Sequence, residues 1–451
     1  MASVIERETS DEPRISRRRA LVALGGGNAV EWYDWMVYGL LAAYIGPQFF
    51  PSGDAVADTM SALAVFAVGF AARPLGAVVF GTLADRIGRR LVMLLSVGTM
   101  VFSTAVIAVL PTHASLGIWA GAVLLLCRIL QGLSTGIEAP LNSAYIVEMA
   151  PEGQTARFGG IVSVYVQAGI IGASLVCFLT SAAVGAEAMA AWGWRIPFVI
   201  GVVVGLFFLW LRRSLPETLN QEENRFSSKG STVTAPGNAS VTAPPAPQPS
   251  IQDVWRGVLR HRFPLLTIVF VVAGAQALNY TWAVGLPSLA RSAYGENPTH
   301  VFAVSTLAGL VVGVLYPVVG RIADRNRISR TFVFSRLAVV PMVFLVLAYQ
   351  GSGITTFAAV MLIGAPLLAF NMGLYNTVSA TLMPMTCRVT GVGLGYAVGV
   401  AGFGGTAPYV LLWLQEADAV WAFPAYVAVL GLTSVLLYVL AFRRGCVRVG
   451  N

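Results

Sequence analysis

An apolar segment near the start of the sequence, GNAVEWYDWMVYG (residues 27–39), contains two carboxylates, Glu31 and Asp34. They are three positions apart, so in a helix they share one face. A carboxylate at the centre of a lipid bilayer costs about 2.5–3.5 kcal/mol or more, so such groups almost always face a bundle interior or a water-filled cavity. We therefore expect Glu31 and Asp34 to point inward, where a carboxyl group can bind and release a proton.

A second apolar segment contains Arg128. A low-dielectric cavity favours the protonated form of a carboxyl group, and a nearby arginine favours the ionised form. Such a cavity can open first to one side of the membrane and then to the other. A carboxylate that gains and loses an arginine partner during this change would bind and release a proton at the same steps as the substrate. We predict that Asp34 carries the proton and Arg128 tunes it, with Glu31 and Glu138 as alternatives for the acidic role. A fixed Asp34–Arg128 pair that only braces two helices is the competing interpretation.

Arg73 is a third charge within an apolar segment. A guanidinium can hold a carboxylate through two parallel hydrogen bonds, which suits an organic acid. We predict that Arg73 and Arg128 contact the substrate, and the alternative is that Arg73 only neutralises Asp34 or Glu31. Arg336 stands near the end of its apolar segment, where we expect its side chain to snorkel to the interface.

Neutral polar side chains occur in apolar segments of the second half. These candidates for substrate binding are Gln276, Asn279, Tyr280, Asn371, Tyr375, Asn376 and Tyr396. Such groups can orient a ligand near the middle of a membrane, or they can join helices by hydrogen bonds. We expect the amino-terminal half to bind the proton and the charged groups of the substrate, and the carboxy-terminal half to select the substrate by its shape.

The composition indicates the elements that must position these residues. The chain has 451 residues, of which 56% are hydrophobic and 11% charged, too few polar groups to cover a soluble globule. About 20 apolar residues cross a membrane as a helix. Twelve such spans are predicted, at residues 20–46, 60–83, 91–111, 115–138, 159–183, 196–211, 264–290, 301–320, 332–349, 354–376, 391–414 and 420–441. The fold class is therefore an all-α integral membrane protein.

The basic residues predict the orientation of these spans. Most of the 29 lysines and arginines fall in the termini and in the connections on the same side, with the exceptions Arg73, Arg128, Arg195, Arg291 and Arg336. The positive-inside rule places that side, and both termini, in the cytoplasm. The net charge of +8 is thus explained by topology, and we expect no nucleic-acid partner.

The chain divides into two halves of six spans. Residues 214–262 form a Pro/Ala/Ser-rich linker between the halves at 20–213 and 263–442, with a terminal arm at 1–19 and a short tail at 443–451. The stretch GTLADRIGRR (81–90) follows the second span, and GRIADRNR (320–327) follows the eighth. The same cluster at equivalent points of two halves indicates an internally duplicated transporter.

The first of these stretches resembles the signature loop of the major facilitator superfamily. Other stretches narrow the resemblance to the metabolite:proton symporter family: GNAVEWYDWMVYG, FAARPLG (70–76), RILQGLSTGIE (128–138), AYIVEMAPEGQTAR (144–157), WGWRIPF (192–198) and RVTGVGLGYAVGVAGFGGTAP (388–408). Members of that family carry citrate, tricarballylate, 2-oxoglutarate, shikimate, proline or betaine. The resemblance implies a twelve-helix major facilitator fold that transports a substrate with protons by alternating access.

The resemblance also implies a gating motif, in which loop charges latch the two halves together. Its residues here are Gly81, Asp85, Arg86, Gly88, Arg89 and Arg90, with Asp324 and Arg325 in the repeat. Ile137 departs from the family, which usually has a glycine before the acid that corresponds to Glu138. A bulky side chain there could reshape the cavity and change the substrate.

We expect the substrate to be a small organic acid, a di- or tricarboxylate such as citrate. The stretch FGGTAPYVLLWL (403–414), together with Arg73, looks like that branch of the family. The alternative is a zwitterionic osmolyte or amino acid of the proline/betaine type. Osmosensing members of that type have a long carboxy-terminal coiled coil, which the tail at 443–451 does not provide.

Other classes of function fit less well. The three histidines, His113, His261 and His300, fall in connections or at span ends and form no cluster with cysteines, so we expect neither an enzyme nor a metal or other cofactor. A non-transporting receptor of the same fold is a remote alternative. We expect a multi-pass protein of the bacterial inner membrane that acts as a monomer, with protons, a small acid and lipid as its partners.

Overall fold

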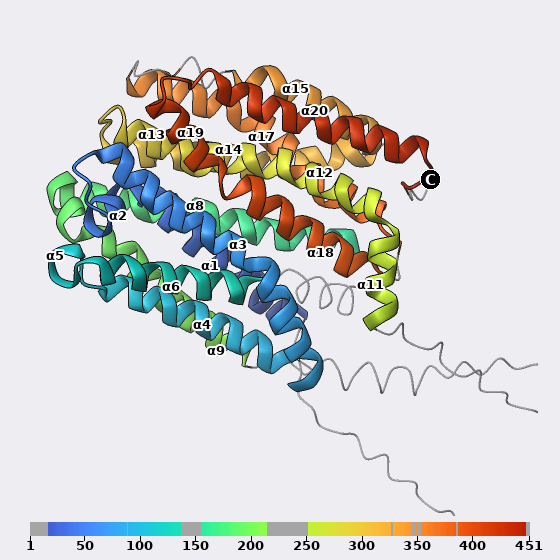
Figure 1. Ribbon diagram of the computed structural model, residues 1–451, viewed down its shortest axis with the longest axis horizontal. Helices are drawn as coiled ribbons and strands as arrows, with labels where there is room; N and C mark the ends of the chain where they lie inside the picture. The colour runs from blue at the N-terminus through green and yellow to red at the C-terminus, as the bar shows by residue number, and fades with distance from the viewer. Residues whose placement is uncertain are drawn as a thin grey trace, which may run out of the picture.

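The computed structural model describes residues 17–87, 89–136, 155–213, 251–325, 328–344, 349, 353–384 and 387–447. Over these ranges the chain forms helices and no strand. The helices lie side by side in a bundle, with the first half of the chain on one side and the second half on the other (Figure 1). Helices suit the interior of a membrane because lipid offers no hydrogen-bond partner to an exposed backbone group.

Six helical rods come from the first half of the chain. They are α1 (Arg17–Leu40) with α2 (Ala42–Phe49), α3 (Ala55–Ile87), α4 (Arg89–Val109), α6 (Ile118–Thr135) after the short α5 (His113–Leu116), α8 (Thr155–Ala191), and α9 (Ile196–Arg212) after the 3₁₀ turn η1 (Gly193–Arg195). Each overlaps one of the first six predicted spans.

Six further rods come from the second half, preceded by α11 (Ile251–Arg260). They are α12 (Arg262–Tyr280), η2 (Thr281–Gly285) and α13 (Leu286–Ser292); α14 (Pro298–Arg325); α15 (Ile328–Val343); α17 (Ile354–Leu382); α18 (Arg388–Gly399), η4 (Val400–Gly404) and α19 (Ala407–Glu416); and α20 (Ala422–Arg443). The expected set of twelve membrane helices is confirmed.

Ten of these rods are long and apolar enough on their own to cross a membrane, among the described residues. The two others are α1, which includes Glu31 and Asp34, and α15, which is described over 16 residues. Both lie alongside the other rods of the bundle in Figure 1. The charges in α1 therefore lower its hydropathy without removing it from the bundle.

Two rods of the second half change helical pitch in their middle. η2 and η4 are π-helical segments of five residues each. A π-bulge adds a residue to a turn and is frequent at functional sites. Trp282 and Ala283 in η2 both line a cavity between the halves, so this wider turn forms part of the cavity wall.

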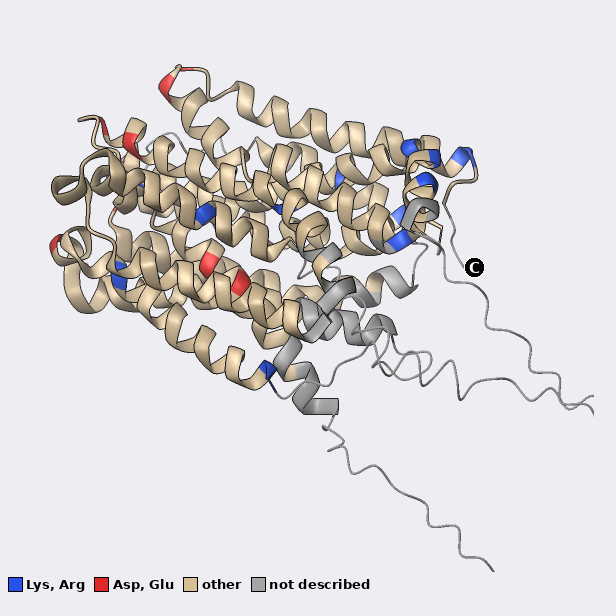
Figure 2. Cartoon of the chain, turned by 60° about the horizontal axis from the view of Figure 1, so that its bottom comes forward, with Lys and Arg blue, Asp and Glu red and all other residues tan. Residues whose placement is uncertain are grey.

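The charged residues separate along the bundle axis. One end, here called the basic end, holds Arg213, Arg262, Arg330, Arg388 and Arg443 at helix termini. The opposite end holds Asp54, Glu187, Glu296 and Asp418. Figure 2 shows most of the blue near the C-terminus, most of the red at the other end, and a few charges of both signs between. This separation is the pattern on which the predicted orientation depends.

Hydrogen bonds join the two halves from the middle of the bundle to the opposite end. The Gln167 side chain donates to the carbonyl oxygen of Gly309 at 3.1 Å, and Ser181 and Thr299 share a hydrogen bond of 2.8 Å between their hydroxyls. Ser288 adds a long contact of 3.4 Å to the carbonyl oxygen of Gly39. The halves therefore touch on the side of the cavity that faces away from the basic end.

Close packing of α3 against α6 depends on glycine. A Cβ atom added to Gly132 would overlap the carbonyl oxygen of Gly69, which is backbone and has little freedom to shift. We predict that Gly132→Val lowers the stability of the detergent-solubilised protein by about 1–3 kcal/mol, the usual cost of overpacking. The measurement is the midpoint of thermal unfolding.

The matched control is Gly98→Val in α4, because no atom of another helix lies within 4 Å of the added Cβ there. We expect that variant to unfold near the wild-type temperature. Equal midpoints for both variants would contradict the assigned packing of α3 on α6.

Candidate functional site

Asp34 and Arg128 form a buried ion pair between α1 and α6. Arg128 Nη1 lies 3.3 Å from Asp34 Oδ2, and the two side chains are 0% and 3% exposed. The Thr104 hydroxyl on α4 donates to Asp34 Oδ1 at 2.6 Å, and Gln131 Nε2 donates to Thr104 Oγ1 at 3.0 Å. Three helices thus hold this carboxylate with an arginine on one oxygen and a hydroxyl on the other.

Glu31 pairs with a different arginine. Arg73 Nη2 on α3 lies 3.5 Å from Glu31 Oε1, and both side chains are buried. Arg73 thus neutralises Glu31 in this structure, and its contact with a substrate stays a prediction. The structure therefore contains two ion pairs, Asp34–Arg128 and Glu31–Arg73, whose acids stand one turn apart on α1.

One tryptophan separates the two pairs. The Arg73 guanidinium carbon lies 4.5 Å from the centre of the Trp35 ring, and that of Arg128 lies 5.6 Å from it. Arg128 also stacks on Tyr38, with its guanidinium carbon 3.9 Å from the ring centre. A cation over an aromatic face gains about 2 kcal/mol or more when desolvated. The rings therefore replace part of the hydration that each arginine loses.

An aromatic layer crosses from the first half to the second. Tyr280 on α12 stacks on Trp32 with ring centres 6.3 Å apart, and meets Phe66 and Phe70 edge-on at 5.9 and 5.0 Å. Trp32 directly follows Glu31, and Phe70 stands three residues before Arg73. The layer lies beside the Glu31–Arg73 pair and links it to the second half.

Several predicted residues of the second half gather near that pair. Gln276 Nε2 contacts the Tyr375 hydroxyl at 3.4 Å, and the Tyr375 and Tyr396 rings stack at 6.4 Å. Tyr280 and Tyr396 are both near enough to Arg73 and Glu31 to interact with them electrostatically. This group is called the tyrosine cluster below, and consists of Tyr280, Tyr375 and Tyr396.

Two other predicted residues have different positions. Asn371 Nδ2 contacts the carbonyl oxygen of Ala275 at 3.4 Å, which joins α17 to α12. Asn376 is exposed on α17, and its side chain hydrogen-bonds Tyr375 at the edge of the tyrosine cluster. Asn371 thus matches the alternative interpretation of these polar groups as contacts between helices.

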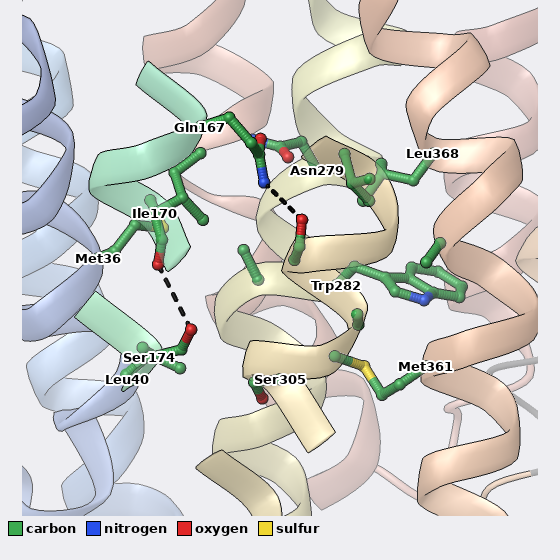
Figure 3. Close-up of a pocket in the computed structure, with 15 residues that line it drawn as sticks. Met36, Leu40, Gln167, Ile170, Ser174, Asn279, Trp282, Ser305, Met361 and Leu368 are labelled. Carbon is green, nitrogen blue, oxygen red and sulfur yellow. Dashed lines mark hydrogen bonds between the residues drawn. The ribbon is translucent and has the colours of Figure 1, made fainter. Parts of the chain in front are cut away.

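A cavity lies between the two halves, and Figure 3 shows the side chains that line it. Its walls come from α1, α8, α12 with η2, α14 and α17. Polar groups on these walls are Gln167, Ser174, Asn279, Ser305 and the Trp282 indole, and the remaining walls are mainly apolar. Figure 3 shows Gln167 and Asn279 close together on one side of the cavity and Trp282 below them. Asn279 is the one predicted substrate residue on this lining.

The sequence reasoning missed Gln167, Ser174, Trp282 and Ser305. All four were visible as polar or amphipathic residues within predicted spans, and Gln167 is a conspicuous amide in the fifth. Their positions on the cavity wall depend on how each helix is rotated about its axis. A single sequence with few charges in α8 and α14 gives little information about that rotation.

The expectation for Arg336 was wrong. Its side chain is 1% exposed, and Nη2 donates to the carbonyl oxygen of Val271 on α12 at 2.7 Å. The guanidinium bonds a neighbouring backbone instead of reaching the membrane surface. Glycine at position 274 makes room for it, because an added Cβ would stand 3.2 Å from Arg336 Nη1.

Some predicted residues lie outside the description. Glu138, Ile137 and Gly88 are not among the described residues. For the gating motif, the backbone of α3 ends at Ile87, α4 begins at Arg89 and α14 ends at Arg325. The side chains of Asp85, Arg86, Arg89, Arg90, Asp324 and Arg325 are not described, so the proposed latch stays a prediction.

Removal of Arg128 would leave Asp34 buried without its counter-charge. Breaking one side of a buried pair typically costs about 3–5 kcal/mol. We predict that Arg128→Gln lowers the thermal unfolding midpoint more than the double variant Asp34→Asn/Arg128→Gln, in which both charges are absent. Thr104→Val is the milder control, because it removes one hydrogen bond to the same carboxylate. A double variant less stable than Arg128→Gln would show that the two side chains are not a compensating pair.

Comparisons with known proteins agree with this architecture. Residues 24–408 match the family described as the Major Facilitator Superfamily. The α-ketoglutarate permease of Escherichia coli (strain K12) is 34% identical over 435 residues, which are 95% of each chain. The ectoine/proline transporter ProP of Corynebacterium glutamicum is 31% identical, over 88% of this chain and 78% of that one.

Solved structures show the same fold at lower identity. The partially occluded inward-open xylose transporter XylE from E. coli superposes with a TM-score of 0.71 at 16% identity, over 95% of this chain and 97% of that one. The D-xylose-proton symporter structure gives a TM-score of 0.69 at 16% identity, over 93% and 97% of the two chains.

The family match and the transporter relatives show that the protein is a multi-pass transporter of the cell membrane and no enzyme. The chain belongs to the Major Facilitator Superfamily, within its metabolite:proton symporter group.

Proposed function

We propose that this protein is a proton-coupled symporter that imports a small dicarboxylate by alternating access. The observation that carries the proposal is the Asp34–Arg128 pair, a carboxylate and a guanidinium 3.3 Å apart inside the bundle. A carboxylate buried this way ionises when its arginine is near and binds a proton when the arginine moves away or binds another anion. The proton and the substrate are then alternative partners of one charged site.

The same logic extends to Glu31 and Arg73, a second pair at 3.5 Å. A dianion entering with one proton would carry a net negative charge inward, which a membrane potential opposes by about 2.3 kcal/mol per 100 mV. Two protons make the import electrically neutral, and each pH unit then contributes about 1.36 kcal/mol per proton. We therefore propose that Asp34 binds one proton and that Glu31 is the candidate for a second.

The substrate class is the less direct part of the proposal. The α-ketoglutarate permease, 34% identical over 95% of this chain, supports a dicarboxylate. The sequence analysis also favoured citrate, so both compounds belong in the first assay. Arg73 and Arg128 stay candidates for direct substrate contact, because either guanidinium could exchange its carboxylate for one on the substrate.

A zwitterionic osmolyte or amino acid is the second candidate. The cavity between the halves has neutral polar walls at Gln167, Ser174 and Asn279, and the Trp282 ring stands among them. An aromatic face binds quaternary ammonium groups by cation–π attraction. The ectoine/proline transporter, 31% identical, supports this alternative.

Uptake into proteoliposomes tests the proposal. We expect labelled 2-oxoglutarate to accumulate when an inward proton gradient is imposed, and unlabelled citrate and other dicarboxylates to compete better than proline or betaine. Asp34→Asn should reduce gradient-driven accumulation at least about tenfold, because the amide cannot carry the proton. Asp54→Asn is the matched control: Asp54 caps the start of α3 at the opposite end, and asparagine caps helices equally well.

Accumulation of labelled proline or betaine, with none of labelled 2-oxoglutarate, would replace the dicarboxylate with the second candidate. Full accumulation by Asp34→Asn would contradict the proton-carrying role of Asp34, whichever substrate is transported.

A further inference from the structure

Arg291 is a cation between the two halves that no part of the mechanism above uses. It stands in α13, near the opposite end from the basic residues. Its Nε and Nη1 atoms are buried and have no hydrogen-bond partner. Arg73 and Arg128 each have a carboxylate within 3.5 Å, whereas no ion pair is formed by Arg291 within the described ranges. The charge of Arg291 is therefore uncompensated by any described acid.

The contact that Arg291 does make crosses from one half to the other. Its guanidinium carbon lies 3.7 Å from the centre of the Tyr44 ring, on α2 of the first half. Cys177 on α8 is also within electrostatic range. A ring face offsets part of the lost hydration of a cation, but Nε and Nη1 of Arg291 are left without acceptors. The guanidinium is thus covered by the first half and retains unused donors.

Three helical segments place Arg291 just beyond the cavity. Leu40 and Ser174 line the cavity, and Tyr44 and Cys177 stand one turn further along their own segments. Ala283 also lines it, and Arg291 follows eight residues later on the same rod, about two turns further toward the opposite end. All three segments run toward the opposite end, so Arg291 and Tyr44 lie beyond the lining residues on that side of the cavity.

We propose that Arg291 is an anion-binding residue at this mouth of the cavity, and that it takes one carboxylate of the substrate when the halves part and the Tyr44 ring withdraws. The proposal rests on the proposed dicarboxylate function and adds the residue that selects for the second negative charge. An uncompensated guanidinium lowers its free energy by binding an anion supplied from outside. A zwitterion or monocarboxylate gives the site less to bind.

Arg336 provides the contrast that makes the assignment to Arg291 specific. It too lacks a carboxylate partner in the described part of the chain, but its Nη2 bonds the backbone of α12 and it contacts Gly274 there. Neither arginine is a lining residue, but the rod that holds Arg291 lines the cavity at Asn279, Trp282 and Ala283, whereas α15, which holds Arg336, contributes no lining residue. Arg291 combines an uncompensated charge, unused donors and a place at the mouth of the cavity.

The test compares two ligands that differ by one carboxylate, 2-oxoglutarate and 2-oxopentanoate, as competitors of labelled 2-oxoglutarate in proteoliposomes. The quantity measured is the ratio of their half-inhibitory concentrations. We expect wild type to prefer the dicarboxylate and Arg291→Gln to reduce that preference about tenfold or more, the loss of one charge-assisted contact. Arg291→Lys keeps the charge and should keep most of the preference.

Tyr44→Leu tests the anion-binding role of Arg291 by a change expected to raise the dicarboxylate preference. It leaves Arg291 in place, so the result does not depend on the folding of an Arg291 variant. Removing the ring uncovers the guanidinium, so we expect the preference for the dicarboxylate to rise above that of wild type. A role of Arg291 as a mechanical latch alone would change transport of both ligands equally and leave the ratio unchanged.

The outcomes separate the two levels of the account. If wild type prefers the dicarboxylate and the ratio is unchanged in Arg291→Gln and Tyr44→Leu, the anion-binding role is wrong and the proposed function stands. If wild type transports proline or betaine and does not bind 2-oxoglutarate, the proposed function fails and the inference about Arg291 fails with it.

Discussion

The ion pair of Asp34 and Arg128 is the interaction on which the rest of the structure depends. Each charge would be costly alone inside an apolar bundle, and together they need close geometry and further hydrogen bonds. Thr104 and Gln131 supply those bonds from α4 and α6. The requirement fixes how α1, α4 and α6 are rotated toward one another, and so fixes the faces that remain for the cavity. A bundle of purely apolar helices would have no comparable reason to choose one rotation.

An ion pair, an aromatic layer and the cavity follow one another along the bundle axis between the halves. The Glu31–Arg73 pair lies beside the tyrosine cluster, the aromatic layer of Tyr280 with Trp32, Phe66 and Phe70 crosses to the second half, and the cavity follows on the far side of that layer. Carboxylates come from the first half, while neutral hydroxyls, amides and an uncompensated arginine come mainly from the second. A substrate held between the halves can therefore influence the ionic partners on one side and the shape of the pocket on the other, which is what coupling requires.

Much of this arrangement could be predicted from the sequence. The predictions that failed share one cause, which is that the rotation of each helix about its axis was not determined. The twelve spans follow from hydropathy, and the inward position of Glu31 and Asp34 follows from the cost of exposing charge to lipid. The same cost argument predicted Arg128 as the partner of Asp34. It could not decide which acid Arg73 would neutralise, and it placed Arg336 at the interface because it counted only position along the helix. Gln167, Ser174 and Ser305 were missed because neutral polar groups tolerate either a helix contact or a cavity wall, so they impose no unique rotation.

The central claim is that substrate and protons cross the membrane together. The most direct measurement records the internal pH of proteoliposomes with a trapped fluorescent dye while 2-oxoglutarate is added outside, with no gradient imposed beforehand. The account predicts acidification of the interior that starts with the substrate, requires the wild-type protein and is lost in Asp34→Asn. Entry of labelled substrate at an undiminished rate with no change of internal pH would contradict it.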